Sequence, residues 1–258
     1  MSTRPSDSVH TILEEESGRD VPLFVHPGWF ERFPWLFQGA TGAGPRHEPF
    51  DLALFGDPRP AGVEERWGCI AEAAGFPRVV HSSQPHGSQV HMHDEGSPGF
   101  HLVPPGDGHV TRVPGVLLAV TVADCVPIYL VDPVQRAVAL LHAGWRGAAA
   151  GILDNGLEIL RDRMASRITD LYMHLGPAIC GSCYEVGVEV FEALDLAAPR
   201  ARGPLDLRAA IVTLAVGAGV KEVRISVSSH CTRCEGSPFF SHRAGDSQRQ
   251  AAVLGVRP

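Results

Sequence analysis

The sequence predicts a mixed α/β fold, with mixed β-sheets flanked by helices, in a single domain. Apolar β-rich runs such as 116–122 and 136–141 are interspersed with segments of helical periodicity such as 63–74, without the regular strand–helix–strand order of a parallel α/β protein. The chain has 258 residues, of which 44% are hydrophobic, so it can bury a substantial core. No internal repeat is evident, and we expect one domain over residues 23–258.

The helix expected at 63–74 is the clearest element, because its apolar residues recur every three or four positions and Gly75 follows as a suitable C-cap. Residues 1–22 are polar and acidic, and we expect a flexible N-terminal arm. The other expected helices cover 148–163, 186–194 and 205–218, and the other expected strands cover 79–84, 171–175, 223–228 and 250–256. We expect a strand or turn at 29–37 that covers an edge of the core, and loops at 39–60 and 92–110.

Composition and charge exclude several classes of protein. A formal net charge of −7, with no cluster of Lys or Arg, argues against nucleic-acid binding. Lys221 is the only lysine, so no Walker-A lysine is available. The N-terminus lacks the basic and apolar regions of a signal peptide, and no apolar run reaches the roughly 18 residues of a membrane span. We therefore expect a cytoplasmic monomer or weak homodimer whose partners are small molecules, not nucleic acid or membrane.

The stretch from Ala123 to Gly147 is the best candidate for an active site. One predicted strand ends at Asp124 and Cys125, and the next ends at His142. In α/β proteins, side chains at strand ends form sites outside the sheet, while the strands below supply a rigid scaffold.

His86, Cys125 and His142 have the chemistry of a metal site. Each follows a predicted strand, and imidazole with thiolate is a favoured ligand set for zinc, whose catalytic sites use three protein ligands and keep one position open. Their separations of 39 and 17 residues are too long for a zinc finger and indicate a site assembled by the fold. The alternative is that Cys125 is a buried core thiol and His142 a hydrogen-bonded residue at a strand end.

Other histidines are weaker candidates. His91 and His93 form an H-x-H pair, which suits a metal on one face of a strand but is more often a solvated edge. Four more fall in predicted loops and are expected to be inert, namely His26, His47, His101 and His109.

Two Cys-x-x-Cys pairs, Cys180/Cys183 and Cys231/Cys234, allow a four-thiolate structural zinc site. The 47 residues between the pairs exceed the usual spacing of such sites, which favours a role for each pair in packing. If the pairs only pack, the protein should bind about one zinc ion per chain.

Arg146 lies just before a predicted helix, where free backbone N–H groups and the helix dipole favour an anion. An arginine at such a position can hold phosphate through two hydrogen bonds. The alternative is a surface arginine stacked on Trp145.

Five segments occur in a specific order: QPHGSQV (84–90), ADCVPI (123–128), HAGWRGAAAGI (142–152), GPAICGSCYEVG (176–187) and CTRCEGSPFFSHR (231–243). They closely resemble the YfiH family, once described as multicopper polyphenol oxidases or laccase-like proteins and later as purine nucleoside phosphorylases with adenosine deaminase activity. The resemblance covers roughly residues 35–256. It implies a fold similar to the catalytic domain of cytotoxic necrotizing factor toxins.

By matching position, the resemblance implies that His86, Cys125 and His142 bind the metal, which would be zinc, with copper as the alternative. It implies that Cys125, His142, Asp124 and Arg146 are the catalytic residues, and that Arg146, Arg66, Tyr184 and Arg243 contact substrate or phosphate. The chain departs from the family at three places, which bear on substrate choice more than on metal binding. These are 51–55 in place of Ser-Leu-Asn-Leu-Gly, Glu65-Arg66 in place of Asn-Arg, and Arg243-Ala244 in place of a double arginine.

The activity that the resemblance implies is zinc-dependent phosphorolysis of adenosine, inosine, guanosine or methylthioadenosine, together with adenosine deamination. Phosphate, oriented by Arg146, would attack ribose C1′ as the purine leaves, and in deamination activated water would attack C6 of adenine, with Asp124 as a proton carrier. One alternative is a cysteine hydrolase, or an enzyme that edits peptidoglycan precursors, with Cys125 as nucleophile and His142 as base. Another is a non-catalytic metal-binding protein. Laccase chemistry is disfavoured, because one His/Cys/His set cannot supply several copper centres.

Overall fold

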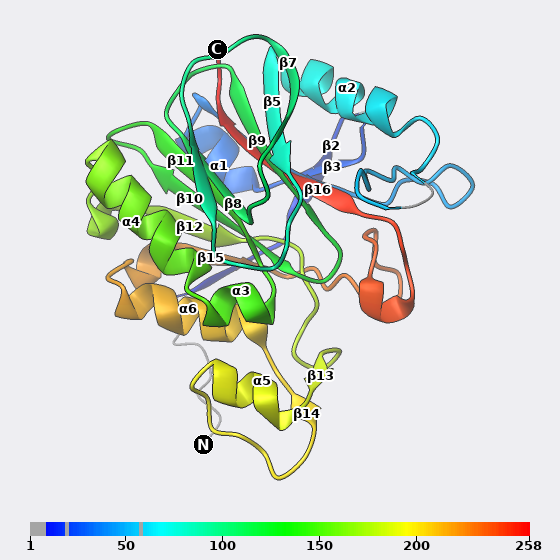
Figure 1. Ribbon diagram of the computed structural model, residues 1–258, viewed down its shortest axis with the longest axis vertical. Helices are drawn as coiled ribbons and strands as arrows, with labels where there is room; N and C mark the ends of the chain where they lie inside the picture. The colour runs from blue at the N-terminus through cyan, green and yellow to red at the C-terminus, as the bar shows by residue number, and fades with distance from the viewer. Residues whose placement is uncertain (1–8, 19–20, 57–58) are drawn as a thin grey trace.

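Two seven-stranded mixed sheets form the body of the protein (Figure 1). The computed structural model describes residues 9–18, 21–56 and 59–258. In spatial order, the first sheet consists of β1 (His10–Ile12), β15 (Ile225–Ser228), β12 (Tyr172–Leu175), β10 (Val126–Asp132), β11 (Ala137–Ala143), β8 (Gly108–Thr111) and β6 (Val90–His93). The second consists of β2 (Glu15–Ser17), β3 (Leu23–Val25), β4 (Leu36–Thr41), β16 (Gln250–Val256), β9 (Val116–Val122), β5 (Arg78–Ser82) and β7 (Gly99–Val103).

The helices are mostly short. They are α1 (Pro27–Arg32), α2 (Val63–Ala74), α3 (Trp145–Ala149), α4 (Ile152–Met164), α5 (Val188–Ala193) and α6 (Leu207–Gly217). Among the residues that the structure describes, no helix combines the length and apolarity needed to cross a membrane. A small sheet of β13 (Glu185–Val186) and β14 (Gly203–Pro204) projects with α5 from one end of the molecule (Figure 1).

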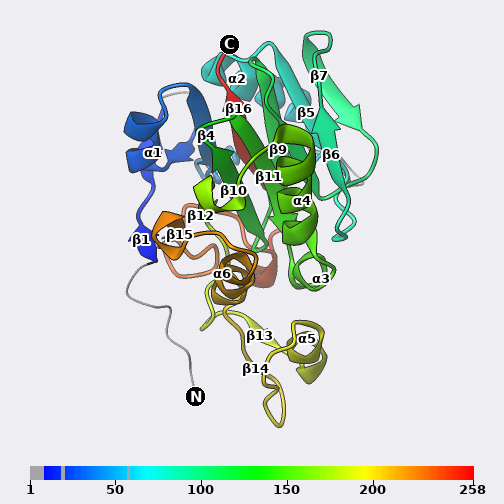
Figure 2. The same ribbon diagram turned by 90° about the vertical axis from the view of Figure 1, so that its left-hand side faces the viewer.

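The main sheets face each other, and helices cover their outer faces. A core of side chains from both sheets lies between them. A second core joins the first sheet to α4 and α6, and a third joins the second sheet to α2. In Figure 1, α4 lies to the left of the sheets and α2 to the right, and in Figure 2 α4 and α6 stand in front of the first sheet. The result is a four-layered single domain, as the mixed α/β prediction required.

This layering explains the almost uninterrupted apolar strands in the middle of the chain. Along β9, Leu118 and Val120 face the core between the sheets, whereas Leu117 and Ala119 face α2. Successive side chains of a strand point to opposite faces, and here both faces are buried, so no position favours a polar residue. Leu118 has no exposed surface, and burial of such a side chain contributes roughly 1.5–3 kcal/mol to folding.

Several predicted elements are confirmed with their bounds. They include α2, β9 and β16, and the φ of +72° at Gly75 is the left-handed C-cap expected for α2. The helix predicted at 148–163 is instead divided between α3 and α4, because Gly151 has a φ of +82° and interrupts the helical backbone. The predicted strand or turn at 29–37 was wrong for its first half, which is part of α1: Pro27 occupies the first turn and the His26 ring accepts a hydrogen bond from the N–H of Trp29 at 3.2 Å.

Two segments predicted to be irregular contain strands. Residues 92–110 include β7 and parts of β6 and β8, whose short alternating patterns are interrupted by glycine and proline. Within the predicted N-terminal arm, β1 pairs in parallel with β15 and β2 pairs with β3. Glu14, between them, is buried and bonds His174 at 2.9 Å. A flexible arm is therefore the wrong description of residues 10–17, whereas residues 1–8 and 19–20 lie outside the described residues.

Candidate metal centre and active site

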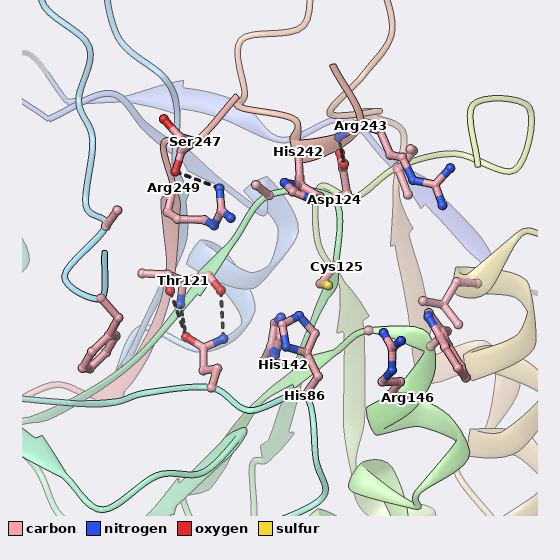
Figure 3. Close-up of a pocket in the computed structure, with 18 of the residues that line it drawn as sticks. His86, Thr121, Asp124, Cys125, His142, Arg146, His242, Arg243, Ser247 and Arg249 are labelled. Atoms are coloured by element: carbon pink, nitrogen blue, oxygen red, sulfur yellow. Dashed lines mark hydrogen bonds between the residues drawn. The ribbon is translucent and has the colours of Figure 1, made fainter. Parts of the chain in front are cut away.

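A cavity of about 600 Å³ lies where β9 ends, β10 begins and β11 ends. Its walls come from the loop after β5, from α3, from the loop after β12 and from residues 242–249, which are far apart in sequence. Ligand sites of small-molecule enzymes typically enclose roughly 300–1,000 Å³, so the cavity has a suitable size for a metabolite. Figure 3 shows its lining side chains.

His86, Cys125 and His142 converge in this cavity, as the strand-end argument predicted. Each offers one ligand atom, and these atoms lie within 4.8 Å of one another. The two imidazole rings meet edge to face, with their centroids 4.9 Å apart. A Cβ added to Gly144 would come 3.1 Å from the Cys125 Sγ and 3.2 Å from the His86 ring, so the glycine keeps the space between the ligands open. The donor set and this space fit a three-ligand metal site.

The backbone has an unusual conformation at His86 and at the residue before Cys125. His86 has a φ of +63° and the neighbour of Cys125, Asp124, has a φ of +86°. Non-glycine residues with positive φ are uncommon and persist where the surrounding structure holds them in place, often at functional sites. Both turns aim a ligand side chain into the cavity.

Asp107 holds two of the ligands in position, and the sequence analysis did not identify it. Its carboxylate has no exposed surface and accepts hydrogen bonds from the His142 Nδ1 at 2.9 Å, the His86 N–H at 3.0 Å and the Gly87 N–H at 2.7 Å. A bond at Nδ1 leaves Nε2 of His142 as the ligand atom, as carboxylate–histidine pairs do at metal sites. A sequence signal existed in Gly106-Asp107-Gly108, an acidic residue at the start of a short β-rich run.

The electrostatics of the site favour a thiolate at Cys125. Burial alone would raise the pKa of this thiol, but the charge and hydrogen bond of His142, with a smaller contribution from His86, lower it to about 6. Burial likewise opposes the charged form of His142, yet Cys125 and Asp107 raise its pKa to about 9. The thiolate is the form of cysteine that binds metals or attacks electrophiles, so both kinds of chemistry are open to Cys125.

Asp124 lies beside Cys125 in the chain, but its carboxylate points the other way, toward the backbone of Arg243 (Figure 3). One oxygen accepts a hydrogen bond from the Thr232 hydroxyl at 2.6 Å and the other from the Arg243 N–H at 2.7 Å. These bonds connect the end of β9 to the loop after β15. They give Asp124 a positioning role in addition to the proton transfer predicted for it.

Arg146 and Trp145 form a pair at the edge of the cavity. The guanidinium lies 4.3 Å from the centroid of the Trp145 ring, which is the stacking considered as an alternative, and both residues line the cavity. Within the described part of the chain, Arg146 makes no side-chain hydrogen bond, so its N–H groups are available to an anion. Arg146 is the second residue of α3, which has only five residues, so the expected dipole contribution is small and the guanidinium itself must provide most of the attraction.

The other predicted substrate contacts have different positions. Tyr184 and Arg243 line the cavity, with the Arg243 guanidinium 4.9 Å from the Tyr184 ring centroid. Arg66 is not among the lining residues: it donates hydrogen bonds to the carbonyls of Asp51 at 2.7 Å and Ala61 at 2.9 Å, and so it supports a loop. Arg66 therefore lies outside the set of residues that line this cavity, and its contact with substrate stays a prediction.

Three further lining residues were absent from the candidates. His242 and Arg249 add positive or titratable groups to the wall, although Arg249 already donates to backbone carbonyls between residues 246 and 248. Gln84 exchanges three hydrogen bonds with Thr121, which fasten the loop bearing His86 to the end of β9 (Figure 3). Gln84 belongs to the QPHG motif, which was the signal for it.

The remaining histidines lie outside this site, and two of them are not in loops as predicted. His109 lies within β8 and His101 within β7. His93 and His109 are buried and bond each other at 2.9 Å, whereas His91 bonds the carbonyl of Pro105. In the described ranges, the H-x-H pair does not belong to a group of residues that could hold a metal ion.

Residues 39–257 match the family described as "Multi-copper polyphenol oxidoreductase laccase". Over 209 residues the chain is 38% identical to the purine nucleoside phosphorylase YlmD of Geobacillus stearothermophilus, covering 75% of this chain and 73% of that protein. It is 37% identical over 211 residues to a purine nucleoside phosphorylase of Deinococcus radiodurans, covering 78% and 79%. It is 40% identical over 148 residues to adenosine deaminase RL5 of an unknown prokaryotic organism, covering 53% and 56%.

Solved structures show the same fold. The crystal structure of YlmD from Geobacillus stearothermophilus superimposes with a TM-score of 0.87 and 29% identity, covering 96% of this chain and all of that one. The crystal structure of Bacillus licheniformis YfiH gives a TM-score of 0.83 and 27% identity, covering 91% and 96%. With a family match over most of its length and the same fold, this chain belongs to the multi-copper polyphenol oxidoreductase laccase family, the YfiH and YlmD proteins.

Proposed function

We propose that this protein is a zinc enzyme that acts on purine nucleosides, as a phosphorylase of adenosine, inosine, guanosine and methylthioadenosine and as an adenosine deaminase. The observation that carries the proposal is the convergence of His86, Cys125 and His142 in a cavity of about 600 Å³ beside an arginine without a hydrogen-bond partner among the described residues. Relatives named purine nucleoside phosphorylase and adenosine deaminase support it.

His86, Cys125 and His142 would hold the metal ion, and Asp107 would keep the His142 imidazole and the backbone of His86 in position. A mixed imidazole and thiolate set with a single carboxylate behind it suits zinc, although it also accepts copper. A zinc ion bound there would supply Lewis acidity that activates water near neutral pH. The protein contributes the rest: it fixes the ligands, and it keeps the space beside Gly144 free.

In phosphorolysis, a phosphate oxygen forms a bond to ribose C1′ while the bond from C1′ to the purine nitrogen breaks, and the purine leaves with a proton. Arg146 is the best-placed cation to orient the phosphate, because its guanidinium is stacked on Trp145 and its N–H groups are uncommitted. Arg243 adds a second positive charge to the same cavity. Tyr184 and Phe55 offer aromatic faces for the purine.

In deamination, water adds to C6 of adenine and ammonia leaves. The ring needs a proton during this exchange, and among the lining residues outside the ligand set His242 carries an imidazole and Asp124 a carboxylate. Since both Asp124 oxygens already accept hydrogen bonds, His242 is the more available of the two.

A metal and turnover assay tests the proposal. The purified protein should contain zinc, and adenosine with phosphate should yield ribose 1-phosphate and adenine, whereas adenosine without phosphate should yield inosine and ammonia. Cys125→Ala should leave a folded protein that has lost the metal of this site and both activities. Full activity of the metal-free wild-type protein would refute the proposal. If copper but not zinc restored the activity of the metal-free protein, the metal of the site would be copper instead of zinc.

The second candidate is a cysteine hydrolase, such as an enzyme that edits peptidoglycan precursors. The specific observation in its favour is the paired shift at the site, which makes Cys125 a thiolate and His142 its protonated partner. Alkylation of Cys125 in the metal-free protein, with loss of a metal-independent hydrolysis, would support it. A protein that binds metal without turnover is the third outcome that the same assay detects. The cytoplasmic location and the monomeric or weakly dimeric state stay predictions.

A further inference from the structure

The two Cys-x-x-Cys pairs meet in space although 47 residues separate them in sequence. Cys180 and Cys183 lie in the loop after β12, and Cys231 and Cys234 lie in the loop after β15. β12 and β15 are neighbouring parallel strands, so their carboxyl ends open onto the same edge of the sheet. A bridge between Ala178 and Cys231 continues this pairing into the loops. Sequence spacing therefore misjudged the pairs, because the parallel crossover accounts for the intervening residues.

The four sulfur atoms have the spacing of a tetrahedral metal site. All four lie within 4.8 Å of one another, with 4.0 Å between the sulfurs of Cys180 and Cys234 and 3.8 Å between those of Cys183 and Cys234. Zinc–sulfur bonds of about 2.3 Å at tetrahedral angles place the sulfurs about 3.8 Å apart. A disulfide would require about 2.05 Å, and these cysteines are free.

Packing does not explain this cluster. Cys231 is buried, but Cys180 and Cys183 are half-buried and Cys234 is exposed, so most of the cluster stays in contact with water and little apolar surface is removed from water there. The first pair is instead held in a turn, with the N–H of Cys183 bonded to the carbonyl of Cys180 at 3.0 Å. In the second pair, the bridge to Ala178 holds Cys231, and a turn in which the N–H of Ser237 bonds the carbonyl of Cys234 at 3.0 Å begins at Cys234.

The backbone and a neighbouring cation also suit a negatively charged thiolate cluster. The N–H of Cys180 donates to the Cys231 Sγ at 3.2 Å, a bond that is strengthened when the sulfur is ionised. Arg233, within the second pair, donates to the carbonyl of Cys183 at 2.9 Å, which brings its charge next to the cluster.

We propose that Cys180, Cys183, Cys231 and Cys234 bind a second zinc ion, as a structural four-thiolate site separate from His86, Cys125 and His142. Binding exchanges thiol protons for Zn–S bonds and releases the protons to solvent, without oxidation or reduction. Four protein ligands leave no open position, so the site is structural rather than catalytic.

The consequence of this site is a fixed wall of the cavity. Tyr184, which lines the cavity, follows Cys183 directly. Thr232, between the two cysteines of the second pair, donates to Asp124 at 2.6 Å, and its N–H bonds the carbonyl of Ala178 at 3.2 Å. A metal that joins the two loops would hold these contacts together.

Elemental analysis of the purified full chain tests the proposal without reference to any enzymatic activity. Wild type should contain two zinc ions per chain, Cys180→Ser/Cys234→Ser one, and Cys125→Ala one. Cys69→Ser, which removes an exposed cysteine outside both groups, should keep two. Cobalt substitution of Cys125→Ala should give the visible spectrum of a tetrahedral four-thiolate site.

A second variant keeps the test decisive if the double variant folds poorly. Cys234→His preserves a four-ligand donor set and should retain the second zinc. One zinc per wild-type chain that disappears with Cys125→Ala would overturn the proposal, as would two disulfides among the four cysteines in freshly purified protein. Failure of the nucleoside assay alone would leave this stoichiometry unchanged, so the two proposals fail separately.

Discussion

Asp107→Asn is the most informative change at the three-ligand site. The carboxylate accepts three hydrogen bonds, from the His142 ring and from two backbone N–H groups at His86 and Gly87. An asparagine has one oxygen and a donating NH₂ group, so at least one of these donors must face another donor. A buried donor left without its acceptor costs about 1–3 kcal/mol.

The cost should appear in metal affinity more than in folding. The substitution removes the carboxylate charge that strengthens the bond to the His142 Nδ1, even where the amide oxygen accepts in its place, and loss of such supporting groups typically weakens metal binding about 10–100-fold. This corresponds to about 1.4–2.8 kcal/mol, which falls within the cost of one orphaned donor. We expect the zinc dissociation constant of the site to rise by that factor.

The assay is competition with a chelating zinc indicator, and the difference between each protein and its Cys125→Ala counterpart assigns the ion to this site. Asp132→Asn is the control for loss of a buried carboxylate charge, because Asp132 is also buried and its Oδ1 accepts two backbone N–H bonds, from Val134 and Gln135, in a turn that does not line the cavity. Unchanged zinc affinity in Asp107→Asn, or an equal loss in Asp132→Asn, would refute the role of Asp107.

Three further changes have measurable outcomes. Arg146→Ala should reduce adenosine phosphorolysis by on the order of 10²-fold while deamination falls less, and Arg146→Lys should recover little of the lost activity. The formation of ribose 1-phosphate and of inosine is followed in the same preparations. Equal losses of the two activities would refute the assignment of phosphate binding to Arg146. In Gly144→Ala the added Cβ would lie 3.1 Å from the Cys125 Sγ, which should weaken zinc binding by about tenfold without loss of folding stability. In Gly217→Ala the added Cβ would have no atom within 4 Å, so this variant should keep the zinc affinity of the wild type. Acid should destabilise the fold below pH 6.5, because burial lowers the pKa of four histidines and the unfolded state therefore takes up protons first. The stability that each neutral histidine contributes is complete above pH 6.5, and it falls by up to about 1.4 kcal/mol per pH unit as the pH decreases. Urea unfolding from pH 7 to 5 measures this slope, which the variant His47→Gln, at an exposed site, should leave unchanged. These histidines are His26, His81, His93 and His109.

The sequence predicted those parts of the site that lie at the ends of strongly apolar strands. β9 has the predicted bounds and β11 ends one residue after His142, so the positions of Cys125 and His142 followed from strand ends alone. Asp107 was missed because the glycines on both sides of it are typical of a loop. In addition, its role depends on a contact with His142, which is 35 residues away in sequence. Local pattern carries no information about such contacts.

The same reason applies to the meeting of the two cysteine pairs and to the position of Arg66. Spacing along the chain is a guide to a zinc site only when the ligands belong to one compact loop, and here adjacent parallel strands bring two loops together. Arg66 was placed at the site by position within a motif, yet its guanidinium turns toward the carbonyls of Asp51 and Ala61. A motif fixes where a residue occurs in the chain, whereas the partners of its side chain depend on the local backbone.

The metal ligands and the cavity wall are held by different parts of the fold. Asp107, directly before β8 of the first sheet, fixes His86 and His142 through hydrogen bonds. Asp124 and the cysteine-bearing loops fix the opposite wall of the cavity through Thr232 and Arg243. The segment at 51–55, where this chain departs most from the family motif, supplies Ala53, Leu54 and Phe55 to the cavity and none of the ligands. Neither carboxylate depends on that segment for its bonds to the site. Under the proposed function, substitutions at residues 51–55 should therefore change the selectivity among nucleosides at constant zinc affinity.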